Sequence, residues 1–154
     1  MLTEEEKREI EEQMRRCPHR QAAGPEALRI VQKHRGWISA ESLGDVARFL
    51  DMTDDELDSV ATCYNLIFQK PVGRHRITVC DSVSCWIMGG EHIRDLLTRR
   101  LGIDWGQTTA DGRFTLLPTA CLGACDKGPA MMVDDDLHVN LRPEGLDDIL
   151  ARYE

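Results

Sequence analysis

The sequence predicts a mixed α/β protein in which a small bundle of helices precedes an α/β domain. Two observations support this fold class. Up to about residue 72 the apolar residues recur at the three- and four-residue spacing of helices, and after Pro71-Val72-Gly73 segments rich in β-branched residues alternate with helical ones. We therefore expect a four-helix bundle over residues 1–72 and an α/β domain over residues 73–154.

The first two helices are predicted from residues at their ends. Thr3 and Glu6 match the S/T-x-x-E pattern of a capping box, so the first helix should begin at Thr3 and end before Pro18. The second should run from Pro25, a residue favoured in the first turn, to Gly36. Glycine suits that end because it adopts the left-handed backbone conformation of a helix C-cap.

The third and fourth helices are predicted in the same way. Ser39 is expected to cap a short third helix. The fourth carries a second capping box, Thr53 with Glu56, and its apolar positions continue to Phe68 before Pro71. Four short amphipathic helices with brief connections should bury their apolar faces in a common core.

The second part is predicted to contain a parallel pair of strands joined by a helix. Residues 76–80 and 114–120 are the strands, and residues 91–101 carry apolar residues on one helical face. More than thirty residues connect the strands, which favours parallel pairing because antiparallel neighbours need only a tight turn. A hairpin over residues 130–141 and a helix over residues 143–153 would complete an α/β sandwich of thioredoxin-like type.

Charge and hydropathy disfavour nucleic-acid and membrane partners. The chain has 19 Lys and Arg against 27 Asp and Glu, a net charge of −8, so its surface repels phosphate backbones and anionic lipids. Its longest uncharged run, residues 114–125, is short of the ~20 apolar residues of a membrane-spanning helix. The acidic start MLTEEEKREI lacks the features of a signal peptide, so we expect a cytoplasmic protein without direct membrane insertion.

The cysteines are the unusual feature of the composition. In a reducing compartment, clustered cysteines indicate metal ligands or redox thiols. Cys80 and Cys85 enclose four residues, Cys121 and Cys125 enclose three, and each pair follows a predicted strand. Because neighbouring parallel strands end at the same edge of a sheet, the two loops should meet, and their four thiolates would form a metal site.

The spacing of the cysteines favours a [2Fe-2S] cluster over structural zinc. Zinc sites usually use C-x2-C pairs, whereas C-x4-C recurs in plant-type ferredoxins. Zinc remains the alternative, and it would make the chain a non-redox interaction module. A dithiol redox enzyme should show C-x-x-C at a helix N-terminus, which the sequence lacks. Cys17 and Cys63 lie on predicted apolar helix faces and are given no ligand role.

Four stretches of the sequence resemble the E subunits of bacterial NADH:quinone oxidoreductase, respiratory complex I. They are EALRIVQKHRGW (26–37), SVATCYNLIFQKPVGRH (59–75), CDSVSC (80–85) and GRFTLLPTACLGACDKGPAMMVDD (112–135), and the resemblance covers almost the whole chain. It implies a thioredoxin-like [2Fe-2S] ferredoxin domain behind a helical bundle. It also implies one [2Fe-2S] cluster whose ligands are Cys80, Cys85, Cys121 and Cys125.

The resemblance implies an electron-transfer chain that exchanges electrons with a flavin on another polypeptide. Its partners would be the flavoprotein (F) subunit, which binds NADH and FMN, and the large iron–sulfur (G) subunit, in the peripheral arm on the cytoplasmic face of the bacterial inner membrane. The sequence has neither a G-x-G-x-x-G after a strand nor a P-loop, so we expect no complete active site and no catalytic residue in this chain. NAD-linked hydrogenases and formate dehydrogenases use a similar diaphorase subunit and remain alternatives.

Overall fold

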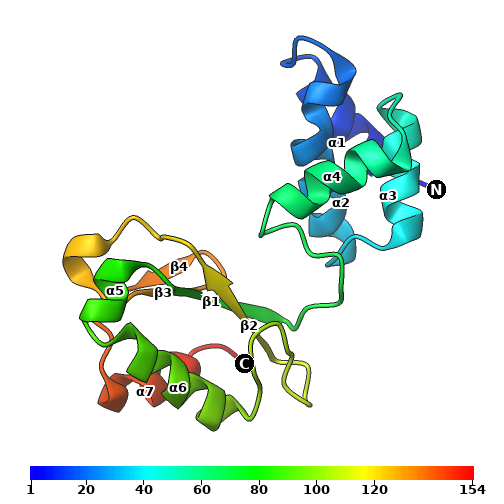
Figure 1. The fold of residues 1–154 in the computed structure, drawn as a ribbon. Coiled ribbons are helices and arrows are strands. Elements are labelled where there is room, and N and C mark those ends of the chain that lie inside the picture. Colours follow the sequence, from blue (N-terminus) through cyan, green and yellow to red (C-terminus); the bar gives the residue numbers. More distant parts are fainter. The chain divides into compact units, whose positions relative to one another are not determined.

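The computed structural model describes all 154 residues, which form two compact units, Met1–Pro71 and Val72–Glu154 (Figure 1). The first unit is helical. Its elements are α1 (Glu4–Met14), the 3-10 turn η1 (Arg20–Ala23), α2 (Gly24–Arg35), α3 (Ala40–Phe49) and α4 (Asp54–Cys63). Neither unit contains a helix with the length and apolar character that crossing a membrane requires.

Side-chain caps fix where three of these helices begin. Thr3 Oγ1 accepts a hydrogen bond from the Glu6 backbone N–H at 3.2 Å, and Glu6 Oε2 accepts one from the Thr3 N–H at 2.8 Å. Thr53 and Glu56 form the same capping box before α4, and Ser39 caps α3. The predicted starts of α1, α3 and α4 are therefore confirmed.

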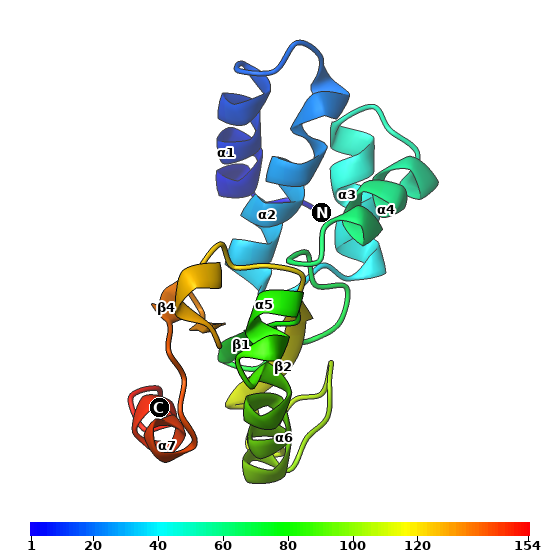
Figure 2. The ribbon, with the colours of Figure 1, turned by 60° about the vertical axis from the view of Figure 1, so that its left-hand side comes forward.

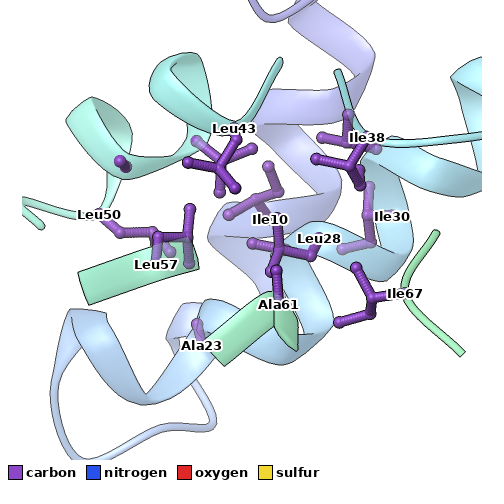
Figure 3. Packing of buried hydrophobic residues seen from close by; sticks show 14 of the residues in the cluster. Ile10, Ala23, Leu28, Ile30, Ile38, Leu43, Leu50, Leu57, Ala61 and Ile67 are labelled. Carbon is purple, nitrogen blue, oxygen red and sulfur yellow. The ribbon is translucent and has the colours of Figure 1, made fainter. Parts of the chain in front are cut away.

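One apolar core joins the four helices of the first unit. Helices of ten to twelve residues are marginal in isolation, so their stability must come from packing. Figure 3 shows the buried side chains pointing toward one another from all four helices. Those labelled there are Ile10, Ala23, Leu28, Ile30, Ile38, Leu43, Leu50, Leu57, Ala61 and Ile67. Each fully buried leucine or isoleucine contributes about 1.5–3 kcal/mol.

The fourth helix is shorter than predicted. Its apolar pattern continues to Phe68, but α4 ends at Cys63 and a loop follows. The Gln32 side chain explains the difference, because its Nε2 donates to the Leu66 carbonyl at 2.9 Å and its Oε1 accepts from the Phe68 N–H at 2.7 Å. The loop backbone is thus satisfied without helical hydrogen bonds, and Phe68 is buried from the loop instead of from a helix.

The second unit contains a four-stranded sheet. Its elements are β1 (His75–Cys80), α5 (Val83–Ile87), α6 (Gly90–Leu101), β2 (Phe114–Thr119), the 3-10 turn η2 (Cys125–Lys127), β3 (Met131–Val133), β4 (Asp136–His138), the 3-10 turn η3 (Pro143–Gly145) and α7 (Leu146–Leu150). The strand order is β2-β1-β3-β4. Strands β1 and β2 are parallel, as their long connection predicted. Strands β3 and β4 form the predicted hairpin, in which β3 pairs antiparallel with β1.

Helices α6 and α7 cover one face of this sheet (Figure 1). Alternate strand residues point to the same face, so Ile77 and Val79 of β1 lie in one apolar core. Leu97 of α6 and Leu146 of α7 complete the core, and both are fully buried. This layer holds β1 and β2 in place, and with them the two loops that leave their carboxyl ends.

The end of the chain differs from the helix predicted over residues 143–153. A 3-10 turn precedes α7, and α7 ends at Leu150. Beyond it the Tyr153 hydroxyl donates to Asp136 Oδ2 at 2.9 Å and lies 2.8 Å from His138 Nε2. Side-chain hydrogen bonds to β4 thus replace the last helical turn.

Candidate metal centre

Two loops at the end of the parallel strand pair carry the four clustered cysteines. Cys80 is the last residue of β1, and its register partner Thr119 is the last residue of β2, so both loops leave the sheet at the same edge. Cys85 lies in α5 after β1, Cys121 lies just after β2, and Cys125 begins η2. Helix α5 packs against η2, and Figures 1 and 2 both show the gold turn near residue 125 beside it. The two loops therefore meet, as the sequence predicted.

Helix α5, which was not predicted, positions Cys85. It contains five residues, too few to show a helical period in the sequence. Cys85 is only 2% exposed. A Cβ on Gly90 would lie 2.7 Å from the Cys85 carbonyl oxygen, so glycine is required for α6 to begin directly against α5. Figure 2 shows α5 directly above α6.

The four thiols differ in their access to solvent. Cys80 and Cys85 are buried, whereas Cys121 and Cys125 are exposed. The sulfurs of the exposed pair lie 3.9 Å apart, and Cys121 Sγ accepts a hydrogen bond from the Gly123 N–H at 3.2 Å. Solvent therefore reaches the thiols from the side of η2 and is excluded on the side of the sheet.

The pKa values of the thiols show that the two pairs influence each other. Burial raises the pKa of Cys85, and the neighbouring Cys80 thiol raises it further. The pKa of Cys125 is raised first by the adjacent Cys121, while the Ser84 side chain lowers it by hydrogen bonding to the sulfur. Cys80 and Cys125 interact across the two loops as well. Thiolates this close repel one another, so bound cations would stabilise them jointly.

The donor set fits a soft metal or an iron–sulfur cluster. The four thiols offer only sulfur ligands, which thiophilic metals and clusters prefer. The thiols are not gathered tightly around one point, because no group of three or more His, Cys, Asp or Glu side chains is placed to hold a metal ion. The backbone also approaches the site closely, since a Cβ on Gly128 would lie 3.3 Å from Cys85 Sγ and 3.1 Å from Met88 Sδ.

The close approach at Gly128 makes its replacement informative. We expect Gly128→Ala to reduce the iron bound per chain at least twofold, because the added methyl group would press against Cys85 Sγ and Met88 Sδ. The backbone would accept alanine, since φ at this position is −67°. Gly145→Ala is the control, because a Cβ there meets nothing within 4 Å. Equal iron content in the two variants after identical purification would contradict the steric argument.

The remaining cysteines lie in the first unit. Cys17 is partly buried against the helical core. Cys63 is exposed at the end of α4, so the apolar helix face predicted for it is wrong. Sequence reasoning singled out neither Ser84 nor Gly128 as part of the site. The position of Ser84 inside the C-x4-C loop was the available signal, whereas the contact of Gly128 with Cys85 depends on the tertiary fold.

Comparisons with known proteins agree with this geometry. The family model for the thioredoxin-like [2Fe-2S] ferredoxins matches residues 10–154. The E subunits of NADH-quinone oxidoreductase in Pseudomonas aeruginosa and in Escherichia coli are each 48% identical over 153 residues, which is 99% of this chain and 92% of theirs.

A solved structure of an NAD+-reducing [NiFe]-hydrogenase in the air-oxidized state is also similar, with a TM-score of 0.69 and 26% identity. The match covers 81% of this chain and 22% of the hydrogenase chain, so this chain spans about a fifth of that longer polypeptide. The predicted mixed α/β fold class is confirmed, and the chain belongs to the thioredoxin-like [2Fe-2S] ferredoxin family as a homologue of the E subunits of bacterial NADH-quinone oxidoreductases.

Proposed function

We propose that this chain is the electron-transfer subunit of the NADH dehydrogenase module of a respiratory complex I. It would hold one [2Fe-2S] cluster on Cys80, Cys85, Cys121 and Cys125. The observation that carries the proposal is the meeting of these two cysteine loops at one sheet edge, in a chain 48% identical to E subunits over nearly its whole length.

The residues around the thiols are suited to holding an anionic cluster. When bound, such a cluster supplies reversible one-electron transfer. The buried Cys80 and Cys85 keep water from the inner side of the site. The Gly123 N–H donates a hydrogen bond to Cys121 Sγ, and such a bond stabilises the more negative, reduced state.

The electrons would come from a partner and not from a substrate bound here. We expect the flavoprotein (F) subunit to bind NADH and FMN, with the large iron–sulfur (G) subunit as a further partner, in the peripheral arm on the cytoplasmic side of the membrane. The sequence supports this division of labour because it contains no dinucleotide fingerprint and no P-loop. The chain would then have no complete active site of its own.

A second candidate is the equivalent diaphorase subunit of an NAD-linked hydrogenase or formate dehydrogenase. The similarity to the NAD+-reducing hydrogenase favours the hydrogenase form. Complex I is preferred because identity to its E subunits is 48% over 99% of the chain, against 26% over 81% for the hydrogenase. Co-purification of the flavoprotein with membrane-arm subunits would support complex I, and co-purification with a nickel-containing subunit would support the alternative.

Metal analysis tests the cluster directly. Iron, zinc and acid-labile sulfide would be measured per chain on anaerobically purified protein, together with an EPR spectrum after dithionite reduction. We expect about two irons, about two sulfides and a rhombic S = 1/2 signal. About one zinc without sulfide or signal would overturn the electron-transfer function and leave a zinc-stabilised interaction module.

A further inference from the structure

The two exposed cysteines lie close enough to react with each other. Their sulfurs, Cys121 Sγ and Cys125 Sγ, are 3.9 Å apart, and both side chains are open to solvent. A disulfide bond is about 2.05 Å long, so the two sulfurs need to approach by only about 2 Å. Three residues separate the cysteines in the chain, and no distant part of the fold has to move to join them.

The segment between the exposed pair can make this movement. Residues 122–124 belong to no helix or strand, and Cys125 begins only the three-residue turn η2. Gly123 has a φ of 74°, and a Cβ built there would meet nothing within 4 Å. Leu122 and Ala124 pack inward against the small apolar cluster beneath the site, so the loop stays attached while its sulfurs turn toward each other.

The buried pair, Cys80 and Cys85, lacks both the access and the freedom to move. Cys80 is 6% exposed and Cys85 is 2% exposed. Cys80 is fixed in β1, where its N–H donates to the Ala130 carbonyl at 3.1 Å, and Cys85 is fixed in α5, against which Gly90 packs. Thiol–disulfide exchange requires access of the oxidant to the sulfur, so an oxidant in solution reaches the exposed pair.

A disulfide in the exposed pair would change what the site can bind. The thiolate is the form of cysteine that binds metals, and a disulfide sulfur carries no such charge. Only the sulfurs of the buried pair would remain, which is half of the four-sulfur set proposed for the cluster. A cluster already bound to all four sulfurs would in turn leave none of them free to react. The cluster and the disulfide therefore exclude each other.

We propose that Cys121 and Cys125 form a reversible disulfide in the cluster-free chain, and that this bond prevents cluster insertion until a thiol reduces it. The oxidant is a low-molecular-weight disulfide, for which glutathione disulfide serves as the probe. The block on cluster insertion rests on the proposed function, because it takes both residues as cluster ligands. The disulfide itself rests only on the distance between the two sulfurs and on their exposure.

Two exchange steps form the bond with atoms and electrons in balance. One sulfur of the exposed pair gives up its proton and attacks a sulfur of glutathione disulfide, which breaks that S–S bond and releases one glutathione. The other sulfur then gives up its proton and attacks the first, which releases the second glutathione. Each glutathione leaves as a thiolate and takes up one of the two protons. The two cysteines are oxidised by two electrons in total, and glutathione disulfide is reduced by two.

Peptide mapping tests the disulfide, because trypsin separates the two pairs of cysteines. Residues 114–127 (FTLLPTACLGACDK) form a tryptic peptide that holds only the exposed pair, and residues 77–94 (ITVCDSVSCWIMGGEHIR) form one that holds only the buried pair. The full chain would be freed of iron with a chelator and a thiol, transferred to buffer without thiol, and incubated anaerobically with glutathione disulfide. Its remaining thiols would be alkylated under denaturing conditions before digestion and mass spectrometry.

Oxidation is expected in one of these peptides only. The peptide of residues 114–127 should be unalkylated and lighter by two hydrogen atoms, because closure of the disulfide removes both thiol hydrogens. The peptide of residues 77–94 should carry two alkyl groups. Two alkyl groups on residues 114–127, or a disulfide that joins the two peptides, would overturn the proposal.

Two cysteine variants test whether the exposed pair closes by itself. Cys125→Ser is expected to keep one glutathione on Cys121, because no neighbouring sulfur remains to displace it. Cys63→Ser is the matched control, since Cys63 is also exposed but lies at the end of α4 in the first unit. It should form the disulfide to the same extent as the wild type. Loss of the disulfide in Cys63→Ser would mean exchange through Cys63 and would overturn direct closure.

Cluster transfer separates this proposal from the proposed function. The oxidised and the reduced chain would each be mixed with a [2Fe-2S]-loaded scaffold protein in the absence of free thiol. The oxidised chain is expected to acquire at least about tenfold less iron, and to recover after treatment with dithiothreitol, because two direct ligands are restored. Equal iron uptake by the two forms would overturn the block and leave the electron-transfer function intact. A reduced chain that takes up no iron would overturn the proposed function and the block together, and the peptide masses alone would then decide on the disulfide.

Discussion

Cys85→Ser is expected to abolish cluster binding. Cys85 is the most buried of the four clustered cysteines, with only 2% of its surface exposed. A serine hydroxyl is a harder donor that seldom ionises, so the soft four-sulfur set would be incomplete. Loss of an outer-shell partner alone costs roughly 10- to 100-fold in metal affinity, and loss of a direct ligand should cost more. Iron content and the EPR signal after dithionite would both fall to background.

Cys63→Ser provides the matched control for this prediction. Cys63 is also a free cysteine, but it is exposed at the end of α4 in the first unit. Its replacement should leave iron, sulfide and the EPR signal at wild-type levels. A native signal in Cys85→Ser, or a lost signal in Cys63→Ser, would show that the proposed ligand set is wrong.

The features that the sequence predicted correctly depend on few residues close together. A capping box needs only a threonine and a glutamate three positions later, and both boxes are formed as predicted. Gly36 ends its helix with positive φ, as predicted. The parallel pairing of β1 and β2 followed from the length of their connection, which is also a property of the chain alone.

The features that the sequence did not predict depend on distant residues. The pattern leading to Phe68 is compatible with a helix, and it is the Gln32 side chain, 36 positions away, that holds the segment as a loop. Asp134 lies within the hairpin predicted over residues 130–141. Its carboxylate lies 2.7 Å from His75 Nδ1 and accepts from the Arg76 N–H at 2.9 Å, and it thereby links the turn to the start of β1.

The cysteine site also contains parts that the sequence predicts and parts that it does not. Its ligand candidates could be chosen from sequence because thiols in two spaced pairs are chemically distinctive. Gly128 and the short helix α5 could not, since a glycine and five residues of mixed polarity have no distinctive pattern. Their roles come from positions that only the folded sheet edge creates.

Glu6→Gln is expected to destabilise the first unit by about 3 kcal/mol at neutral pH. Glu6 is 1% exposed, and both of its carboxylate oxygens accept hydrogen bonds from Arg35 at 2.7 Å. Removing one charge from a buried pair typically costs about 3–5 kcal/mol, because the other charge is left uncompensated. The lower end applies here because the Arg35 side chain is 27% exposed.

The same ion pair should make stability depend on pH in the acid range. The hydrogen bond from Arg35 lowers the pKa of Glu6 from 4.5 to about 2, against the opposing effect of burial. A carboxyl group with a lowered pKa contributes stability above the unfolded-state value and loses it as the pH falls toward the folded-state value. For this shift the contribution is about 3 kcal/mol, and it should disappear between about pH 4.5 and pH 2.

Urea unfolding of the wild type and Glu6→Gln between pH 7 and pH 3 measures this dependence. The free-energy difference between them should be largest at neutral pH and shrink steadily below about pH 4.5, since a protonated Glu6 resembles glutamine. Glu12→Gln is the control, because Glu12 and Arg16 form a mostly exposed ion pair at 3.0 Å whose loss should cost less than about 1 kcal/mol. A difference between wild type and Glu6→Gln that stays constant over this pH range would mean that the packing and cap of α1, and not the charge of Glu6, account for the loss of stability.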